Sequence, residues 1–191
     1  RLARGQDVTS HQEIQQLGLD ADWIAHEAFA YIPLGDATVN LTFGEQTGNW
    51  KRINQTTSGK TVKEKVFKLW LSHGEQYAYM VTPFEGNALP TPVPQQKIRV
   101  LSNTPELQAI THLPSGKVGI VFHQAGTIEI ASDLMVTVDH PCLLLVDTQK
   151  RQAHVSDPTQ SLEQLKVTLS SAHDISLPRG QNAGKSTTFR F

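Results

Sequence analysis

The chain has 191 residues, 38% of them apolar and 18% charged, so it can form one sizeable hydrophobic core or two small ones, and a disordered or fibrous protein is excluded. Seventeen basic and eighteen acidic residues give a net charge of −1, which provides no overall field to attract DNA, RNA or an anionic membrane, so we expect neither partner. The longest uninterrupted apolar segments, such as 28–32 and 142–146, have five residues each, whereas a membrane-spanning helix needs about 20.

The N-terminal segment is polar and irregular. Because the chain begins with Arg1 rather than Met and shows no signal-peptide pattern, we expect it to be part of a longer protein. Ser10 followed by Glu13 has the spacing of a capping box, which predicts a short helix with Ile14 and Leu17 facing a core.

Short alternating segments rich in Val, Ile, Thr and aromatic residues, separated by Gly, Pro, Asn and Asp, predict an all-β protein from residue 23 onward. The predicted strands cover residues 23–32, 37–43, 63–72, 76–82, 97–101, 107–111, 117–122, 127–130, 135–138, 143–147, 152–155 and 164–170. Strands that follow one another at roughly 8–12 residues, as they do after residue 97, are typical of a sandwich or barrel.

The segment 66–71 has apolar side chains on both faces, which predicts a central strand covered on two sides, with Trp70 buried between sheets. The next predicted strand, 76–82, follows after the short connection Gly74-Glu75. This spacing predicts a hairpin.

Four prolines and a glycine between residues 83 and 96 predict a linker, because proline cannot donate a hydrogen bond to a strand neighbour or occupy a helix interior. We therefore expect a first domain at 1–95 and a second domain at 96–172. Residues 173–191 are predicted to be a polar tail, in which only 187–191 could form a strand.

Residue types that carry chemistry form no catalytic or metal-binding pattern. The single cysteine, Cys142, lies in an apolar segment, which predicts a buried thiol. The eight histidines show no metal-ligand spacing, and the segment 180–186 is one residue too short for a phosphate-binding loop, so we expect no metal and no cofactor. His73 ends an apolar strand just before Gly74, which favours a structural imidazole bonded to the backbone over a catalytic one.

Three segments occur in a characteristic order: Thr47-Gly-Asn-Trp-Lys-Arg-Ile-Asn54, Leu69-Trp-Leu-Ser-His-Gly74 and Tyr77-Ala-Tyr-Met-Val-Thr-Pro83. They resemble the "TGxWxxIN", "LWxxHG" and "YAYxxxP" segments of polysaccharide lyase family 8, which contains chondroitin AC, hyaluronan and xanthan lyases. Residues 23–33 are similar to the strand that precedes these segments in the family, and 98–110 and 155–160 to parts of its C-terminal domain.

The resemblance implies the rear part of an antiparallel super-sandwich followed by a small C-terminal antiparallel β-sandwich. In this family, catalytic residues lie on an N-terminal helical toroid to which nothing here corresponds, so no catalytic residue is assigned. The residues Trp50, Trp70, His73, Tyr77 and Tyr79 are expected to be structural, and the glycan-contacting residues are undefined.

The implied parent protein is an extracellular or periplasmic lyase that cuts acidic polysaccharides by β-elimination, with its catalytic toroid as the partner of this chain. In that reaction a base removes the proton at C5 of a uronic acid while an acid protonates the leaving oxygen. The alternative is a free-standing carbohydrate-binding or scaffolding module without lyase activity.

Overall fold

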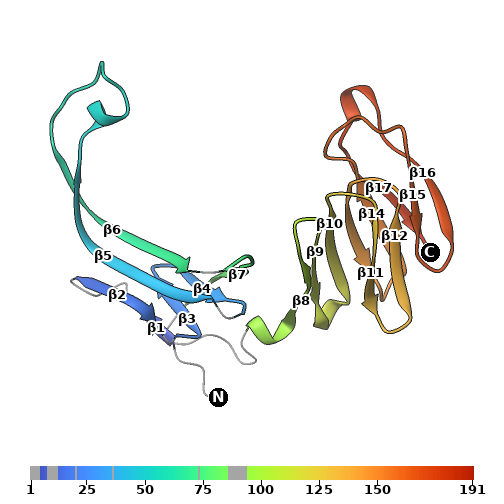
Figure 1. Cartoon of the computed structure of the whole chain (residues 1–191), viewed down its shortest axis with the longest axis horizontal. Coiled ribbons are helices and arrows are strands. Elements are labelled where there is room, and N and C mark those ends of the chain that lie inside the picture. Colours follow the sequence, from blue (N-terminus) through green and yellow to red (C-terminus); the bar gives the residue numbers. More distant parts are fainter. Residues whose placement is uncertain (1–4, 8–12, 20, 36, 73, 86–93) are drawn as a thin grey trace. The chain divides into compact units, whose positions relative to one another are not determined.

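A computed structural model of the chain describes residues 5–7, 13–19, 21–35, 37–72, 74–85 and 94–191. These residues form an all-β protein built from several mainly antiparallel sheets, which confirms the predicted fold class. The chain separates into two compact units, 1–95 and 96–191, and each is described by itself (Figure 1). Within the described ranges, no helix is long and apolar enough to cross a membrane.

The first sheet of the N-terminal unit contains four strands in the order β1-β3-β4-β7. Their bounds are Gly5–Asp7 for β1, Trp23–His26 for β3, Phe29–Pro33 for β4 and Tyr79–Pro83 for β7. β1 runs parallel to β3, and the other two pairs are antiparallel.

The single strand expected at residues 23–32 is instead the hairpin of β3 and β4. The chain reverses where Glu27 takes a left-handed backbone conformation with φ of 54°. Sequence reasoning missed this turn because glutamate is uncommon at positive φ, where glycine or asparagine is the usual sign of a turn.

The second sheet of this unit has the order β2-β5-β6. The strands are β2 (Ile14–Leu19), β5 (Thr38–Gly48) and β6 (Val62–Ser72). β5 and β6 pair along their whole lengths, from Thr38 opposite Ser72 to Gly48 opposite Val62. They form a long hairpin, the arm of the unit, whose far end carries a 3-10 turn at Trp50–Arg52 (Figure 1).

The helix expected from the Ser10 and Glu13 spacing is wrong within the described residues, and Ser10 itself lies outside them. Ile14–Leu19 is strand β2, which pairs antiparallel with β5. Gly18, with φ of 69°, lies where the register of this pairing shifts. Pairing with a long neighbouring strand therefore outweighs a local helix-start pattern.

The hairpin expected between 63–72 and 76–82 is also wrong. β6 pairs with β5 and β7 pairs with β4, so the two consecutive strands are edge strands of different sheets. The alternation of a strand shows which side chains share a face, but it does not identify the strand next to it.

Two small clusters of buried side chains hold the N-terminal unit together. One lies where β3 meets the second sheet and consists of Ile24, Val39 and Leu41 with partly buried neighbours that include Phe67, Leu69 and Leu71. The other lies on the opposite face of the first sheet and consists of Trp23, Ala25, Ala30, Ile32 and Phe84.

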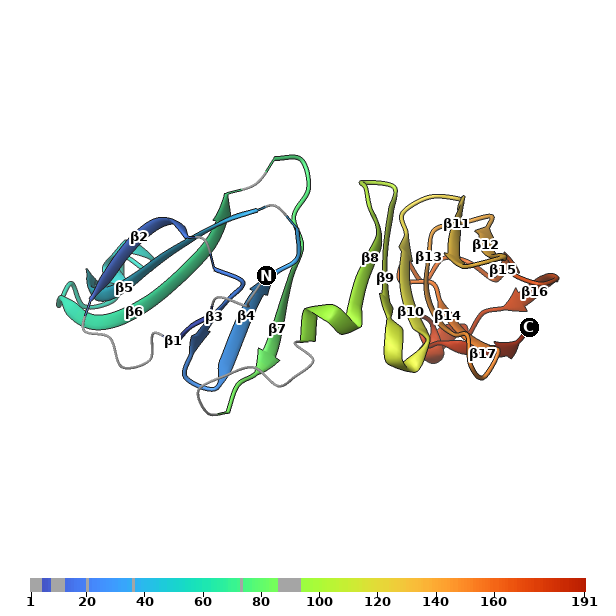
Figure 2. The same ribbon diagram turned by 90° about the horizontal axis from the view of Figure 1, so that it is seen from below.

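The C-terminal unit is a sandwich of a six-stranded sheet, ordered β17-β14-β13-β10-β9-β8, and a four-stranded sheet, ordered β11-β12-β15-β16 (Figure 2). The larger sheet contains β8 (Ile98–Asn103), β9 (Leu107–His112), β10 (Lys117–Phe122), β13 (Cys142–Asp147), β14 (Gln152–Ser156) and β17 (Thr187–Arg190). The smaller sheet contains β11 (Gly126–Ala131), β12 (Leu134–Val138), β15 (Gln164–Thr168) and β16 (Ala172–Ser176).

One continuous core fills the space between these two sheets, because alternate side chains of each strand point inward. In β10, for example, Val118, Ile120 and Phe122 are buried, whereas Lys117 on the same strand is exposed. Strands in this unit follow the sequence prediction closely for that reason.

The prediction of a polar tail at 173–191 needs correction. Residues of this segment form most of β16, which pairs with β15. The strand that the sequence allows at 187–191 is β17, which pairs with β14. β16 buries Ile175, and one apolar side chain in a short strand gives too weak an alternation to recognise.

Most of the proline-rich segment expected as a linker at 83–96 lies outside the described residues. β7 ends at Pro83, and a 3-10 turn covers Pro94–Lys97.

Candidate functional site

An open groove of about 530 Å³ lies between the two sheets of the N-terminal unit. Its walls come from β4, β5, β6 and β7, so it opens where the edge strands β6 and β7 separate. The lining is aromatic and apolar, and we call it the aromatic groove: Tyr31, Ile32, Pro33, Val39, Phe67, Lys68, Leu69, Trp70, Leu71, Tyr77 and Tyr79.

Ring contacts hold the Phe67 side chain in place in the lining of the aromatic groove. The Phe67 ring stacks on the His26 ring at a centroid distance of 4.3 Å and lies 5.6 Å from the Tyr31 ring. On the other face of β6, the Lys68 ammonium lies 5.0 Å from the centre of the Trp70 ring, within the range of a cation–π interaction. β6 therefore carries aromatic side chains on both faces.

The five residues expected to be structural lie in two places. Trp70, Tyr77 and Tyr79 line the aromatic groove, and Trp50 lies at the far end of the arm. His73 lies outside the described residues. Three of these side chains are more exposed than structural residues are expected to be: Trp50 is 64% exposed, Tyr77 53% and Tyr79 58%.

The predicted burial of Trp70 needs correction. β6 has β5 on one side and forms the edge of its sheet, and Trp70 is partly buried rather than enclosed between sheets. Apolar side chains on both faces of β6 predict a central strand. In this chain they instead leave an apolar edge open to solvent.

The chemistry available in the aromatic groove is limited. Its described lining contains phenol groups and the Lys68 ammonium, but no carboxylate, imidazole or side-chain amide. In the part of the chain that the structure describes, no three His, Cys, Asp or Glu side chains lie close enough to hold a metal ion. This composition suits stacking and apolar packing.

Cys142 is buried, as the sequence predicted. Burial raises the pKa of its thiol to about 12, and the Asp139 and Asp157 carboxylates add to this effect. A thiol in this state is not a nucleophile at neutral pH.

Sequence reasoning missed a buried carboxylate in the C-terminal unit. Asp157 is 3% exposed and accepts hydrogen bonds from the backbone N–H groups of Thr159, Ser161 and Leu162, each at 2.8 Å. The Thr159 hydroxyl donates a fourth bond at 2.6 Å. Burial alone would raise the pKa of Asp157, but these bonds outweigh it and bring the pKa to about 2.

Comparison with known families agrees with this architecture. Residues 2–88 match the family model described as polysaccharide lyase family 8, super-sandwich domain, and residues 99–166 match the model described as the C-terminal beta-sandwich domain of the same family. The chain belongs to polysaccharide lyase family 8.

Curated relatives from this family are much longer than the chain. A chondroitinase-AC from Pedobacter heparinus is 32% identical over 179 residues, which cover 85% of this chain and 25% of the relative. A hyaluronate lyase from Thermasporomyces composti is 31% identical over 159 residues, which cover 78% of this chain and 20% of the relative. The chain thus spans about a quarter or less of these family 8 lyases.

Solved structures from the family share the fold. A chondroitinase AC lyase studied as an enzyme–oligosaccharide complex matches 98% of this chain with a TM-score of 0.77 and 28% identity, and the match covers 29% of that lyase. A Paenibacillus xanthan lyase matches 94% of the chain with a TM-score of 0.70 at 16% identity, over 21% of its own length.

Proposed function

We propose that this chain is the non-catalytic β portion of a secreted lyase that cuts uronic-acid polysaccharides of the chondroitin or hyaluronan type by β-elimination. Its role is to support the helical domain that carries the catalytic residues and to complete the substrate cleft. The observation that carries this proposal is the aromatic groove, whose described lining is mainly apolar and lies along the edge strands of two sheets.

The reaction sets clear chemical requirements. A base must remove the C5 proton, an acid must protonate the leaving oxygen, and hydrogen-bond donors or cations must neutralise the uronate carboxylate. The described lining of the aromatic groove contains three phenols and one ammonium group among apolar side chains, and no carboxylate, imidazole or side-chain amide. In this proposal, the groups that carry out the reaction belong to another part of the lyase.

The exposed apolar side chains of the first sheet of the N-terminal unit support a packing role. Phe29, Tyr79 and Val81 lie on neighbouring strands β4 and β7 and are between 46% and 58% exposed. Exposed apolar patches beside unpaired strand edges mark interaction surfaces. In this proposal, the rest of the same lyase covers them.

The isolated chain is expected to show no lyase activity on chondroitin sulfate, hyaluronan or xanthan, because in this proposal the acid, base and carboxylate-neutralising groups lie in another part of the lyase. The absorbance of the unsaturated uronate product measures turnover, and the P. heparinus chondroitinase-AC serves as the positive control. Turnover that disappears when a residue of this chain is replaced would contradict the proposal.

Trp70→Ala distinguishes a supporting chain from a free-standing module. In the isolated chain we expect a loss of about 1 kcal/mol, smaller than for a fully buried aromatic residue, because Trp70 is partly exposed. In the complete lyase the loss is expected to be larger, since the rest of the protein covers the groove. Denaturation midpoints measure both, with Trp70→Phe as the control that keeps most contacts.

Equal losses in the isolated chain and in the complete lyase would show that nothing covers the aromatic groove. That result would favour the free-standing module over the supporting role.

A further inference from the structure

We propose that the loop of residues 49–61 at the end of the β5–β6 arm, the distal loop, binds a segment of acidic polysaccharide. Trp50 stacks on a sugar ring, and Lys51, Arg52 and Lys60 pair with the carboxylate or sulfate groups of the polymer. This inference rests on the proposed function and assigns part of the substrate contact to a specific loop.

The distal loop carries a net positive charge. The distal loop contains three basic residues and no acidic residue, although the chain as a whole has a net charge of −1. All three basic side chains are exposed, and within the described part of the chain none of them forms an ion pair. Their charges are therefore available to an anionic ligand.

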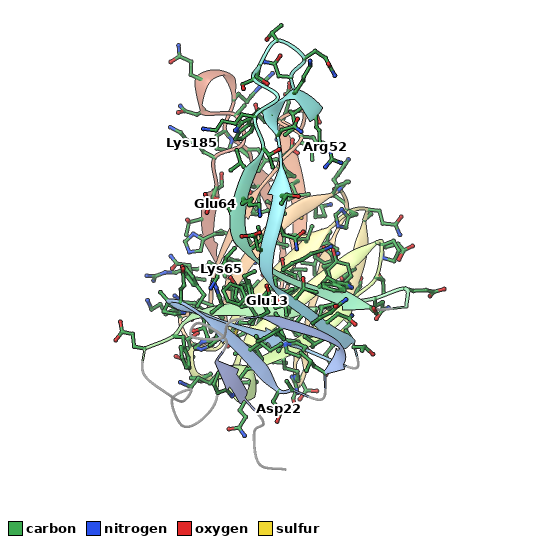
Figure 3. All side chains as sticks on the ribbon, turned by 90° about the vertical axis from the view of Figure 1, so that its left-hand side faces the viewer. Glu13, Asp22, Arg52, Glu64, Lys65 and Lys185 are labelled. Carbon is green, nitrogen blue, oxygen red and sulfur yellow. The ribbon has the colours of Figure 1, made fainter. Side chains whose placement is uncertain are left out.

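The part of the arm next to the distal loop, residues 45–48 and 62–65, adds no net charge. On this part of the arm, Lys63 and Lys65 are balanced by Glu45 and Glu64, and the Lys63 ammonium lies 3.0 Å from the Glu45 carboxylate. Arg52 lies farther along the arm than Glu64 and Lys65 (Figure 3). The positive charge is thus concentrated at the far end.

An exposed apolar surface accompanies these cations. Trp50 is 64% exposed and Ile53 is 81% exposed. Both line a shallow hollow of about 310 Å³ that continues down the arm past Gly48 to Val62 and Val66, with Glu64 as the one charged residue of its described lining. A flat indole beside an open hollow offers a face for a sugar ring, whose C–H groups form an apolar side.

The distal loop has a defined shape before any ligand binds. Backbone N–H groups of Ile53 and Asn54 both donate to the Trp50 carbonyl, at 3.0 and 2.9 Å. The Asn54 side chain accepts bonds from the backbone and hydroxyl of Thr56, at 3.0 and 2.7 Å. A preordered loop loses less conformational entropy on binding.

The composition of the distal loop favours a polysaccharide over a protein partner. Protein interfaces have an apolar centre that is depleted in charged residues, especially lysine. The distal loop contains two lysines, an arginine and one tryptophan, and the remaining positions are mostly Asn, Gln, Thr and Ser, which can bond to sugar hydroxyls. Charge complementarity selects an acidic polymer.

The test measures equilibrium binding of chondroitin sulfate oligosaccharides to the 191-residue chain by titration calorimetry at low salt. Trp50→Ala is expected to weaken binding about fivefold, and the double variant Lys51→Gln/Arg52→Gln about three- to tenfold. Trp50→Phe should restore most of the affinity, and added salt should weaken binding because the contacts are exposed.

The matched control is Lys150→Gln/Lys185→Gln, which removes the same charge at exposed sites of the C-terminal unit and should leave affinity unchanged. Neutral dextran should not bind. Thermal unfolding should be the same for all variants, since every altered side chain is exposed.

The inference is overturned if the chain binds no oligosaccharide, or if the distal-loop variants bind as tightly as the control. It is also overturned if those variants keep their affinity for the oligosaccharide but weaken assembly with the rest of the lyase, which would assign the loop to a protein contact. Lyase turnover is measured separately, so lost binding leaves the proposed function standing, and turnover by the chain alone overturns that function without affecting this inference.

Discussion

Leu144→Ala is expected to destabilise the C-terminal unit by about 2–5 kcal/mol, the usual cost of removing a buried leucine from a well-packed core. Leu144 is 3% exposed and lies in the central strand β13, opposite Ile120 on one side and Val155 on the other. Its side chain belongs to the core between the two sheets, so truncation leaves a cavity there. The midpoint of chemical denaturation measures the loss.

The neighbouring residue supplies a matched control. Leu143 lies on the same strand but points to the opposite face and is 38% exposed. Leu143→Ala should therefore cost less than about 1 kcal/mol. Equal shifts for the two variants would mean that the register of β13 is one residue away from that described.

Asp157→Ala is expected to cost about 3 kcal/mol, because it leaves three part-buried backbone N–H groups without their charged acceptor. The variant should unfold at a lower temperature without any change in the N-terminal unit. Near-ultraviolet circular dichroism and thermal unfolding measure the effect, and a midpoint equal to that of the unchanged chain would contradict it.

The same carboxylate gives a specific pH dependence. Its pKa is depressed from 3.8 to about 2 in the folded chain, so ionised Asp157 stabilises the fold above the unfolded pKa. That contribution, about 2.5 kcal/mol, is lost as the pH falls from about 4 to about 2. Asp157→Asn should remove this part of the pH dependence, whereas Asp139→Asn, at a more exposed carboxylate, should change it less.

Local alternation predicted the C-terminal sandwich well, because each strand there has one buried and one exposed face. The strand predicted at 117–122 matches β10, and the strand at 143–147 differs from β13 by one residue. The N-terminal unit was harder to predict. Its arm pairs residues that are up to 34 positions apart, from Thr38 to Ser72, and no local pattern in β6 identifies β5 as the neighbour.

The sequence predicts Trp70, Tyr77 and Tyr79 to be structural and defines no groove, although all three line the aromatic groove. Their exposure could not be predicted, because it depends on how two sheets diverge rather than on the order of side chains within a strand. The turn around Asp157 did carry a usable signal, since Asp followed by Pro and Thr is typical of a side-chain-capped turn.

Because the thiol of Cys142 is buried, its reaction with a thiol reagent reports when the C-terminal core opens. Cys142 is the single cysteine, it lies in the first position of the central strand β13, and solvent does not reach it. A maleimide or a disulfide reagent can therefore attach only in molecules whose C-terminal core has come apart. The time course of such labelling, followed by mass spectrometry, records how often that core opens under native conditions, with no engineered probe.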